Sequence, residues 1–115
     1  MRIRWNCEQV SKCDAYLYDV EMEGKEEYPN LYVGYGEGPP NGIYKTSIVT
    51  MEKQFYADCL KYNPVMVIRE TGKISEMKKR EKEEMDLNRV NTSEKYYNSS
   101  RSNGFKMDLD LTAVL

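Results

Sequence analysis

The chain has 115 residues, of which 40% are hydrophobic and 31% charged, and its formal net charge at pH 7 is −2. This length and composition predict one folded domain rather than a disordered chain. The sequence contains no histidine, which excludes Ser-His-Asp and Cys-His nucleophile systems and every metal site with histidine ligands. The slightly acidic balance gives no overall attraction to phosphate, so a nucleic-acid binder of this composition would gather its basic residues on one face.

The cysteines and the apolar runs bear on the cellular compartment. Cys7, Cys13 and Cys59 form no CxxC pair, and their odd number argues against a zinc site and a disulfide framework. They are expected to be small buried apolar residues in a reducing cytoplasm. No signal-peptide core follows Met1, and the longest purely apolar run, at positions 65–68, is too short to cross a membrane. The expected protein is cytoplasmic, with no membrane partner.

The N-terminal part of the chain carries three strand signals. Alternation at positions 2–5 predicts a short first strand, and alternation at 16–22 predicts a half-buried strand. A charged turn at 23–27 then leads to a return strand at 31–35, which completes a hairpin. The glycines and prolines that follow, up to position 42, predict a loop.

The second half alternates helices with a strand. A helix is predicted from the N-cap Thr50 to the stop at Asn63-Pro64, with Phe55 and Cys59 on its inward face. The apolar run at 65–69 is typical of a central strand, and a second helix is predicted at 74–88. The core order β-β-α-β-α predicts an α+β fold, in which helices cover a small mixed sheet.

A carboxylate interrupts the apolar stripe of the second predicted helix. Glu81 lies between Met77 and Met85 at helical spacing. An inward carboxylate is costly unless it is paired, protonated or bound to a metal ion. One interpretation places Glu81 at the edge of the stripe, or paired with Lys78 or Lys45. The other makes it a ligand of Mg²⁺, with waters and substrate oxygens completing the shell.

Two tyrosines on neighbouring predicted strands suggest a site. Tyr18 and Tyr32 lie in the two halves of the hairpin, and Gly34 admits close approach of a ligand. Tyrosine is also a good strand former, so a purely structural role is the alternative. Two hydroxyls, an acid and a tight glycine turn on one surface together favour a site.

These features resemble the GIY-YIG nuclease domain over nearly the whole chain. Tyr16-Leu17-Tyr18 stands where that family has Gly-Ile-Tyr, without the glycine, and Tyr32-Val33-Gly34 matches Tyr-Ile-Gly. Glu81 matches the metal-binding glutamate of the family, and Asn98 matches its late asparagine. The resemblance implies a single GIY-YIG-like domain over 1–115, with a core at about 14–104 and an apolar C-terminal tail at 105–115.

The resemblance also implies an activity. It is that of an endonuclease dependent on Mg²⁺ or Mn²⁺ that hydrolyses DNA phosphodiester bonds, in a small stand-alone, phage-like protein. Tyr18 would position or deprotonate the attacking water, and Tyr32 would assist it. Glu81 would ligate the metal ion, and Asn98 would hold its first shell or a phosphate.

The catalytic arginine of the family is missing. No arginine occurs between Gly34 and Lys61, and Lys45 is the nearest substitute. Lysine supplies charge without the bidentate geometry of a guanidinium, so this exchange is not conservative. Further along, Arg101 either contacts a phosphate or belongs to a polar turn. The apolar tail either docks on the sheet or forms a homodimer contact.

Two functional hypotheses and one structural alternative follow. The first is the Mg²⁺-dependent DNA endonuclease. The second is a GIY-YIG-fold binding protein that has lost turnover and holds a nucleotide or nucleic acid, or inhibits a partner protein, as in phage counter-defence. If the motifs are coincidental, the chain is a structural α+β domain. The nuclease hypothesis expects one cleft that is faced by four residues: Tyr18, Tyr32, Glu81 and Asn98. It also expects Lys45 within reach of a phosphate.

Overall fold

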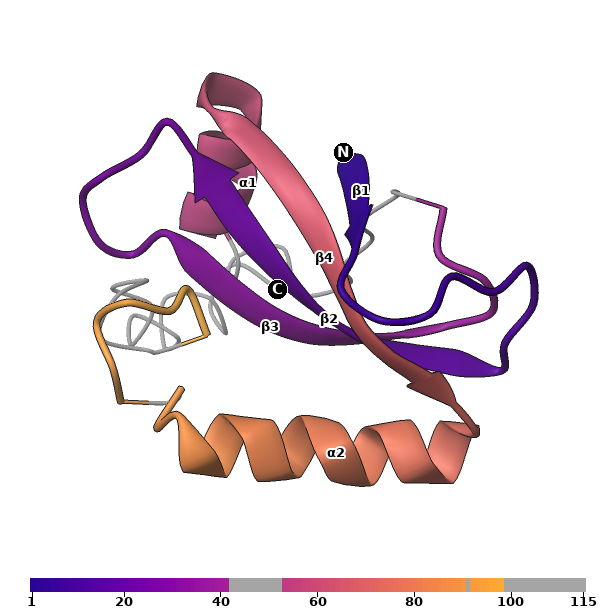
Figure 1. Cartoon of the computed structure of the whole chain (residues 1–115). Coiled ribbons are helices and arrows are strands. Elements are labelled where there is room, and N and C mark those ends of the chain that lie inside the picture. Colours follow the sequence, from indigo (N-terminus) through magenta and orange to yellow (C-terminus); the bar gives the residue numbers. More distant parts are fainter. Residues whose placement is uncertain (42–52, 91, 99–115) are drawn as a thin grey trace, which may run out of the picture.

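The computed structural model describes residues 1–41, 53–90 and 92–98 (Figure 1). In chain order the elements are β1 (Arg2–Trp5), β2 (Ala15–Glu23), β3 (Leu31–Glu37), α1 (Lys53–Lys61), β4 (Asn63–Gly72) and α2 (Ile74–Leu87). The predicted order of strands and helices is therefore confirmed. Neither α1 nor α2, the helices of the described residues, has the length and hydropathy needed to cross a membrane.

The four strands form one mixed sheet in the order β1-β4-β2-β3. β2 pairs antiparallel with both β3 and β4, whereas β1 pairs parallel with β4. β4 is thus a central strand, as its apolar run predicts. It is also longer than predicted, because β2 pairs with it from Asn63 to Gly72 and includes the flanking polar residues in the ladder.

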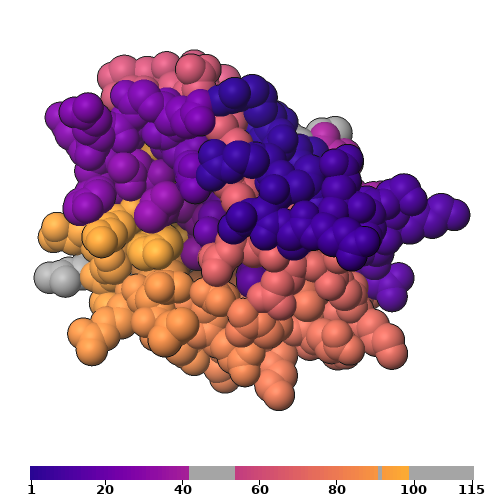
Figure 2. All heavy atoms as spheres, viewed as in Figure 1, coloured from indigo at the N-terminus to yellow at the C-terminus, as the bar shows by residue number. Residues whose placement is uncertain are grey.

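Both faces of the sheet are covered, and α1 and α2 lie on opposite sides of it (Figure 1). On one face, which we call the α1 face, the even-numbered side chains of β2 from Tyr16 to Met22 pack with Phe55 of α1. On the other, the α2 face, Leu17 and Val33 pack with Met77 of α2. Figure 2 shows α2 as a continuous layer packed against the strands. The alternation in β2 was predicted, but Leu17 is fully buried because α2 covers its face.

The segment before position 99 closes the outer edge of β3. The backbone N–H of Leu31 donates to the carbonyl of Lys95, and the N–H of Tyr97 donates to the carbonyl of Leu31. The side chain of Asn98 continues this ladder one step further, onto Val33. An edge strand with unpaired backbone groups is a site for unwanted pairing, and here the same chain covers it.

Candidate functional site

Two tyrosine rings lie across two glycines of the neighbouring strand. Tyr18 pairs with Gly34 and Tyr16 pairs with Gly36 in the antiparallel β2–β3 ladder. A methyl group built on either glycine would overlap the ring of its tyrosine partner. The space above Gly34, which the sequence assigns to a ligand, is therefore filled by the Tyr18 ring.

The rings continue into the core as a row. Centroid distances are 5.7 Å from Tyr16 to Tyr18 and 6.3 Å from Tyr18 to Tyr32. Tyr32 stacks on Phe55 of α1 at 4.8 Å, and Phe55 meets Tyr97 edge-on at 5.2 Å. Such contacts add to the stabilisation from burial. The two predicted site tyrosines therefore share a face, and Tyr32 is also an interior packing residue.

A small cavity opens at the end of this row that is formed by Tyr16 and Tyr18. We call it the tyrosine cavity. It has a volume of about 230 Å³ and is lined by Tyr16, Tyr18, Tyr35, Gly36, Glu37, Pro39 and Asn41. Of the two predicted site tyrosines, Tyr18 lines the cavity and Tyr32 is not among its described lining residues. Tyr16, which was not predicted as a site residue, lines it as well. The sequence held a signal for Tyr16, because it lies two residues before Tyr18 on the same face of the strand.

Two of the phenols at this cavity, those of Tyr16 and Tyr35, have raised pKa values. Burial raises the pKa of Tyr16, and the nearby Cys13 adds to the shift. Partial burial and a 2.9 Å hydrogen bond from its own hydroxyl to Glu37 raise the pKa of Tyr35 to about 12. A general base works best when its pKa lies near the working pH. Tyr16 and Tyr35 are therefore suited to hydrogen bonding rather than to proton abstraction.

Glu81 lies on the opposite face of the sheet from Tyr18 and Tyr32. Its α2 neighbours Met77 and Met85 pack on the α2 face, whereas Tyr18 and Tyr32 pack on the α1 face. Burial raises the pKa of Glu81. Within the described part of the chain, it forms no hydrogen bond or ion pair. The structure brings Tyr18 and Tyr32 together, but the sheet lies between them and Glu81.

The surroundings of Glu81 include an aromatic ring. Its charge acts on Tyr35, and the ammonium group of Lys78 lies 5.8 Å from the centre of the same ring. Among residues 1–41, 53–90 and 92–98, no three His, Cys, Asp or Glu side chains gather closely enough to hold a metal ion. The resemblance implies a different arrangement, in which Glu81 binds Mg²⁺ together with waters and substrate oxygens, and that role stays a prediction.

Asn98 has a structural task. Its Nδ2 donates to the carbonyl of Val33 at 2.8 Å, and its Oδ1 accepts the backbone N–H of Val33 at 3.0 Å. The side-chain amide is thus used as a substitute for a paired strand. Lys45 and Arg101 lie outside the described residues, as does the predicted N-cap Thr50.

A buried polar cluster on the α1 face was not predicted. Asp58 of α1 is 5% exposed and accepts hydrogen bonds from Lys25 and Tyr97, each at 2.6 Å. Gln54 donates to its second oxygen at 3.0 Å. The sequence contains one signal for Asp58, which lies three residues after the buried Phe55 and so near the inward face of the helix. Two of its partners, Lys25 and Tyr97, come from distant parts of the chain.

A second unpredicted cluster joins the α2 face to β4. A bulge in the β2–β4 pairing leaves Arg69 unpaired in the ladder, and bulges can redirect a side chain. Arg69 lies 3.0 Å from Asp19 and 3.6 Å from Glu84. Arg80 joins Glu84 and Glu70 at 2.8 and 2.7 Å. Asp19 keeps one buried oxygen, Oδ1, without a hydrogen-bond partner among the described residues.

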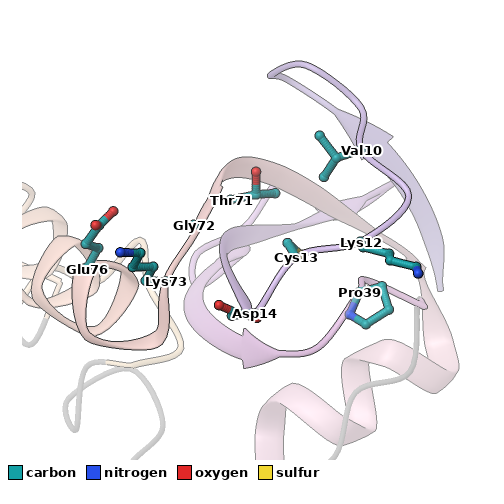
Figure 3. Close-up of a pocket in the computed structure, with 9 residues that line it drawn as sticks. All are labelled: Val10, Lys12, Cys13, Asp14, Pro39, Thr71, Gly72, Lys73 and Glu76. Atoms are coloured by element: carbon teal, nitrogen blue, oxygen red, sulfur yellow. The ribbon is translucent and has the colours of Figure 1, made fainter.

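A larger cavity shares Pro39 with the tyrosine cavity (Figure 3). We call it the loop cavity. It has a volume of about 760 Å³ and is lined by Val10, Lys12, Cys13, Asp14, Pro39, Thr71, Gly72, Lys73 and Glu76. In Figure 3, Lys12 lies next to Pro39, and Lys73 lies beside Glu76 at the start of α2. Two lysines and two carboxylates balance the charge of this cavity.

Comparisons with protein-family models, with curated proteins and with solved structures gave no match to this chain. The resemblance to GIY-YIG domains therefore rests on the short motifs around Tyr18, Tyr32, Glu81 and Asn98. Their placement in the fold, together with the tyrosine cavity, is what bears on function.

Proposed function

We propose that this protein is a GIY-YIG-like binding domain that holds a nucleotide or a nucleic acid at the tyrosine cavity without hydrolysing it. The observation that carries the proposal is the position of the sheet between Glu81 and the two tyrosines that the resemblance makes catalytic, Tyr18 and Tyr32. Hydrolysis of the kind the resemblance implies needs the water-positioning hydroxyl and the metal ligand at one phosphate.

Three further observations support binding over turnover. The amide of Asn98 is used by Val33, so it is not available for a metal shell or a phosphate. The raised pKa of Tyr16 keeps its hydroxyl protonated, so it can donate a hydrogen bond but is poorly suited to act as a general base. The arginine that the family uses to stabilise the transition state is missing between Gly34 and Lys61. What remains is a concave site with several polar groups, which is the usual form of a ligand site.

Nicking of supercoiled plasmid tests the absence of turnover. The purified protein is incubated with and without Mg²⁺, together with Glu81→Gln and the matched control Asp86→Asn, an exposed carboxylate on the same helix. We expect no Mg²⁺-dependent nicking by any of the three proteins. Nicking by the wild type and Asp86→Asn that is lost in Glu81→Gln would establish the endonuclease instead.

Binding is tested separately. Fluorescence anisotropy of a labelled single-stranded oligonucleotide of mixed sequence, and calorimetric titration with a mixture of nucleoside monophosphates, should each report on the cavity. We expect saturable binding of at least one of these probes, weakened by Tyr16→Phe. A protein that bound neither probe would contradict the proposal.

A further inference from the structure

β1 forms an edge of the sheet whose outer side is open within the described part of the chain (Figure 1). The N–H of Asn6 donates to the carbonyl of Ile68 in β4. Because the backbone groups of a strand point alternately to its two sides, the N–H and C=O groups of Ile3 and Trp5 point away from β4. Neither residue has a backbone hydrogen bond on that side to another described residue. An edge of this kind is a template for pairing with a further strand.

The side chains of β1 alternate between cations and apolar groups. Arg2 and Arg4 are exposed on one face of the strand. Ile3 and Trp5 are half-buried on the other, where they pack against the core of the α1 face. Each arginine forms one ion pair, with a glutamate of β2, and its side chain is still more than half exposed. A guanidinium has several N–H donors, so each arginine can bind a second carboxylate.

The C-terminal tail, at 105–115, has the complementary pattern in its sequence. The tail lies outside the described residues. Positions 107–111 read MDLDL, and this alternation is typical of a strand with one apolar face. If Leu109 lies beside Ile3, in either strand direction, both aspartates fall beside the two arginines of β1. Cross-strand pairs of opposite charge and of apolar groups are the contacts that stabilise a sheet.

The other edge of the sheet is less suited to this segment. The outer side of β3 is already paired at Leu31 and Val33 by the segment that ends at Asn98. Further along β3, Gly36 offers no side chain for a cross-strand contact, and Glu37 is exposed. Glu37 would meet either the aspartates or the apolar side chains of the tail. Neither pairing is favourable, and like charges directly opposite each other are destabilising.

The reach of the tail points to a second copy of the chain. Asn98 lies outside β3, and a strand outside β1 is five strand spacings away, about 24 Å. Because α1 and α2 cover opposite faces of the sheet, the connection must also pass out and back around a helix layer about 10 Å thick. The chain from Asn98 to Asp108, about ten residues, spans at most about 35 Å, which is shorter than this route of about 44 Å.

We propose that the protein forms a homodimer in which the C-terminal tail of each copy pairs with the outer edge of β1 of the other, with Asp108 and Asp110 beside Arg2 and Arg4. The exchange is reciprocal, so the same contact is made twice, as a two-fold dimer requires. This inference is independent of the proposed function, because β1 is not part of the described lining of the tyrosine cavity.

Sedimentation velocity of the full chain at about 100 µM, well above the Kd of a micromolar dimer, tests the pairing. We expect the mass of two 13.5 kDa chains. Asp108→Lys/Asp110→Lys and, separately, Leu109→Asp should each weaken the dimer about tenfold or more, since each change is felt in both contacts. Glu26→Lys/Glu27→Lys makes the same charge change at two exposed positions of the hairpin tip and is the matched control, which should keep the dimer.

Mixing two variants locates the contact. Arg2→Glu/Arg4→Glu reverses the charge of the β1 edge, and alone it should also lose the dimer. An equimolar mixture with Asp108→Lys/Asp110→Lys should form a heterodimer, because each tail then meets an edge of opposite charge. Thermal melting by circular dichroism checks that each variant is folded. The two tail variants decide the question by themselves if the edge variant unfolds.

The outcomes that would overturn the inference are distinct. A monomeric wild type at this concentration, or a dimer that survives both tail changes, would overturn it. A mixture of the two folded charge variants that stays monomeric would do the same. A monomeric wild type whose melting temperature falls in Leu109→Asp would place the tail on its own molecule and would remove the second copy. None of these outcomes bears on nucleotide binding.

Discussion

The two faces of the sheet hold their acidic groups in different ways. On the α1 face, Asp58 is surrounded by donors from Lys25 and Tyr97, which keep its pKa below the ordinary value although burial opposes this. On the α2 face, Asp19 has an unpartnered oxygen, and Glu81 has no ion pair within the described residues. Burial raises the pKa of both groups, and for Asp19 it outweighs the neighbouring Arg69. Ionised Asp58 therefore stabilises the folded protein, whereas the ionised forms of Asp19 and Glu81 destabilise it.

This difference bears on where function lies. A partly buried carboxylate with a raised pKa is an ordinary sign of a functional group, and Glu81 has both properties in addition to its inward position in the helical pattern. The tyrosine cavity, however, opens at the end of the aromatic row on the α1 face, where Tyr16 and Tyr18 reach it. Glu81 is not among the described residues that line this cavity, although its charge acts on Tyr35, which lines it.

The largest expected effect comes from breaking the Asp58 cluster. Asp58→Ala leaves the ammonium group of Lys25, whose side chain is 10% exposed, buried without its partner. Loss of one member of a buried pair costs about 3–5 kcal/mol, so we expect a loss of this size in urea unfolding at pH 7. The double variant Asp58→Leu/Lys25→Met should recover much of it. A loss below about 1 kcal/mol in Asp58→Ala would show that the pair contributes little.

The same cluster predicts acid sensitivity. Because the folded-state pKa of Asp58 is lowered from 3.8, its contribution is fully present above that pH and is lost as the pH falls through the folded-state value. Urea unfolding from pH 7 downward should therefore show a smaller decline for Asp58→Asn than for the wild type. Equal declines would place the acid sensitivity elsewhere.

The next largest expected loss of stability comes from disturbing the contacts between glycines and tyrosine rings. Gly34→Ala and Gly36→Ala push a methyl group into the rings of Tyr18 and Tyr16, and overpacking costs about 1–3 kcal/mol. We expect losses in this range by urea unfolding. In a Tyr18→Leu background, Gly34→Ala should cost clearly less. An unchanged cost there would mean that the backbone, and not the ring, requires glycine at this position.

The sequence predicted what local periodicity controls. Alternation along β2 placed Tyr16 and Tyr18 on one face, and the helical stripe placed Met77 and Met85 inward. Contacts between distant segments left no such pattern. The pairing of Lys25 with Asp58 spans 33 residues, and that of Val33 with Asn98 spans 65.

Glu84 shows where the helical pattern alone was insufficient. It follows Met77 by seven residues, which is two helical turns, and therefore lies on the same stripe as Glu81. It is 7% exposed, because Arg69 and Arg80 compensate its charge. The sequence analysis named Glu81 alone as inward, and the deeper burial of Glu84 depends on cations from another strand and from another turn of the helix.

The smallest expected effect concerns Glu81 and contrasts the α2 face directly with Asp58 on the α1 face. Because the folded-state pKa of Glu81 is raised above its ordinary value of 4.5, its contribution is fully present below that pH and is lost as the pH rises through the folded-state value. At pH 7 the ionised side chain is a cost, so Glu81→Gln should stabilise the protein, by less than about 1 kcal/mol. The gain should shrink toward pH 4 in urea unfolding, which is opposite to the behaviour expected of Asp58. A loss of stability at pH 7 would show that the ionised carboxylate has a partner, and the α2 face would then have to be considered again as a binding site.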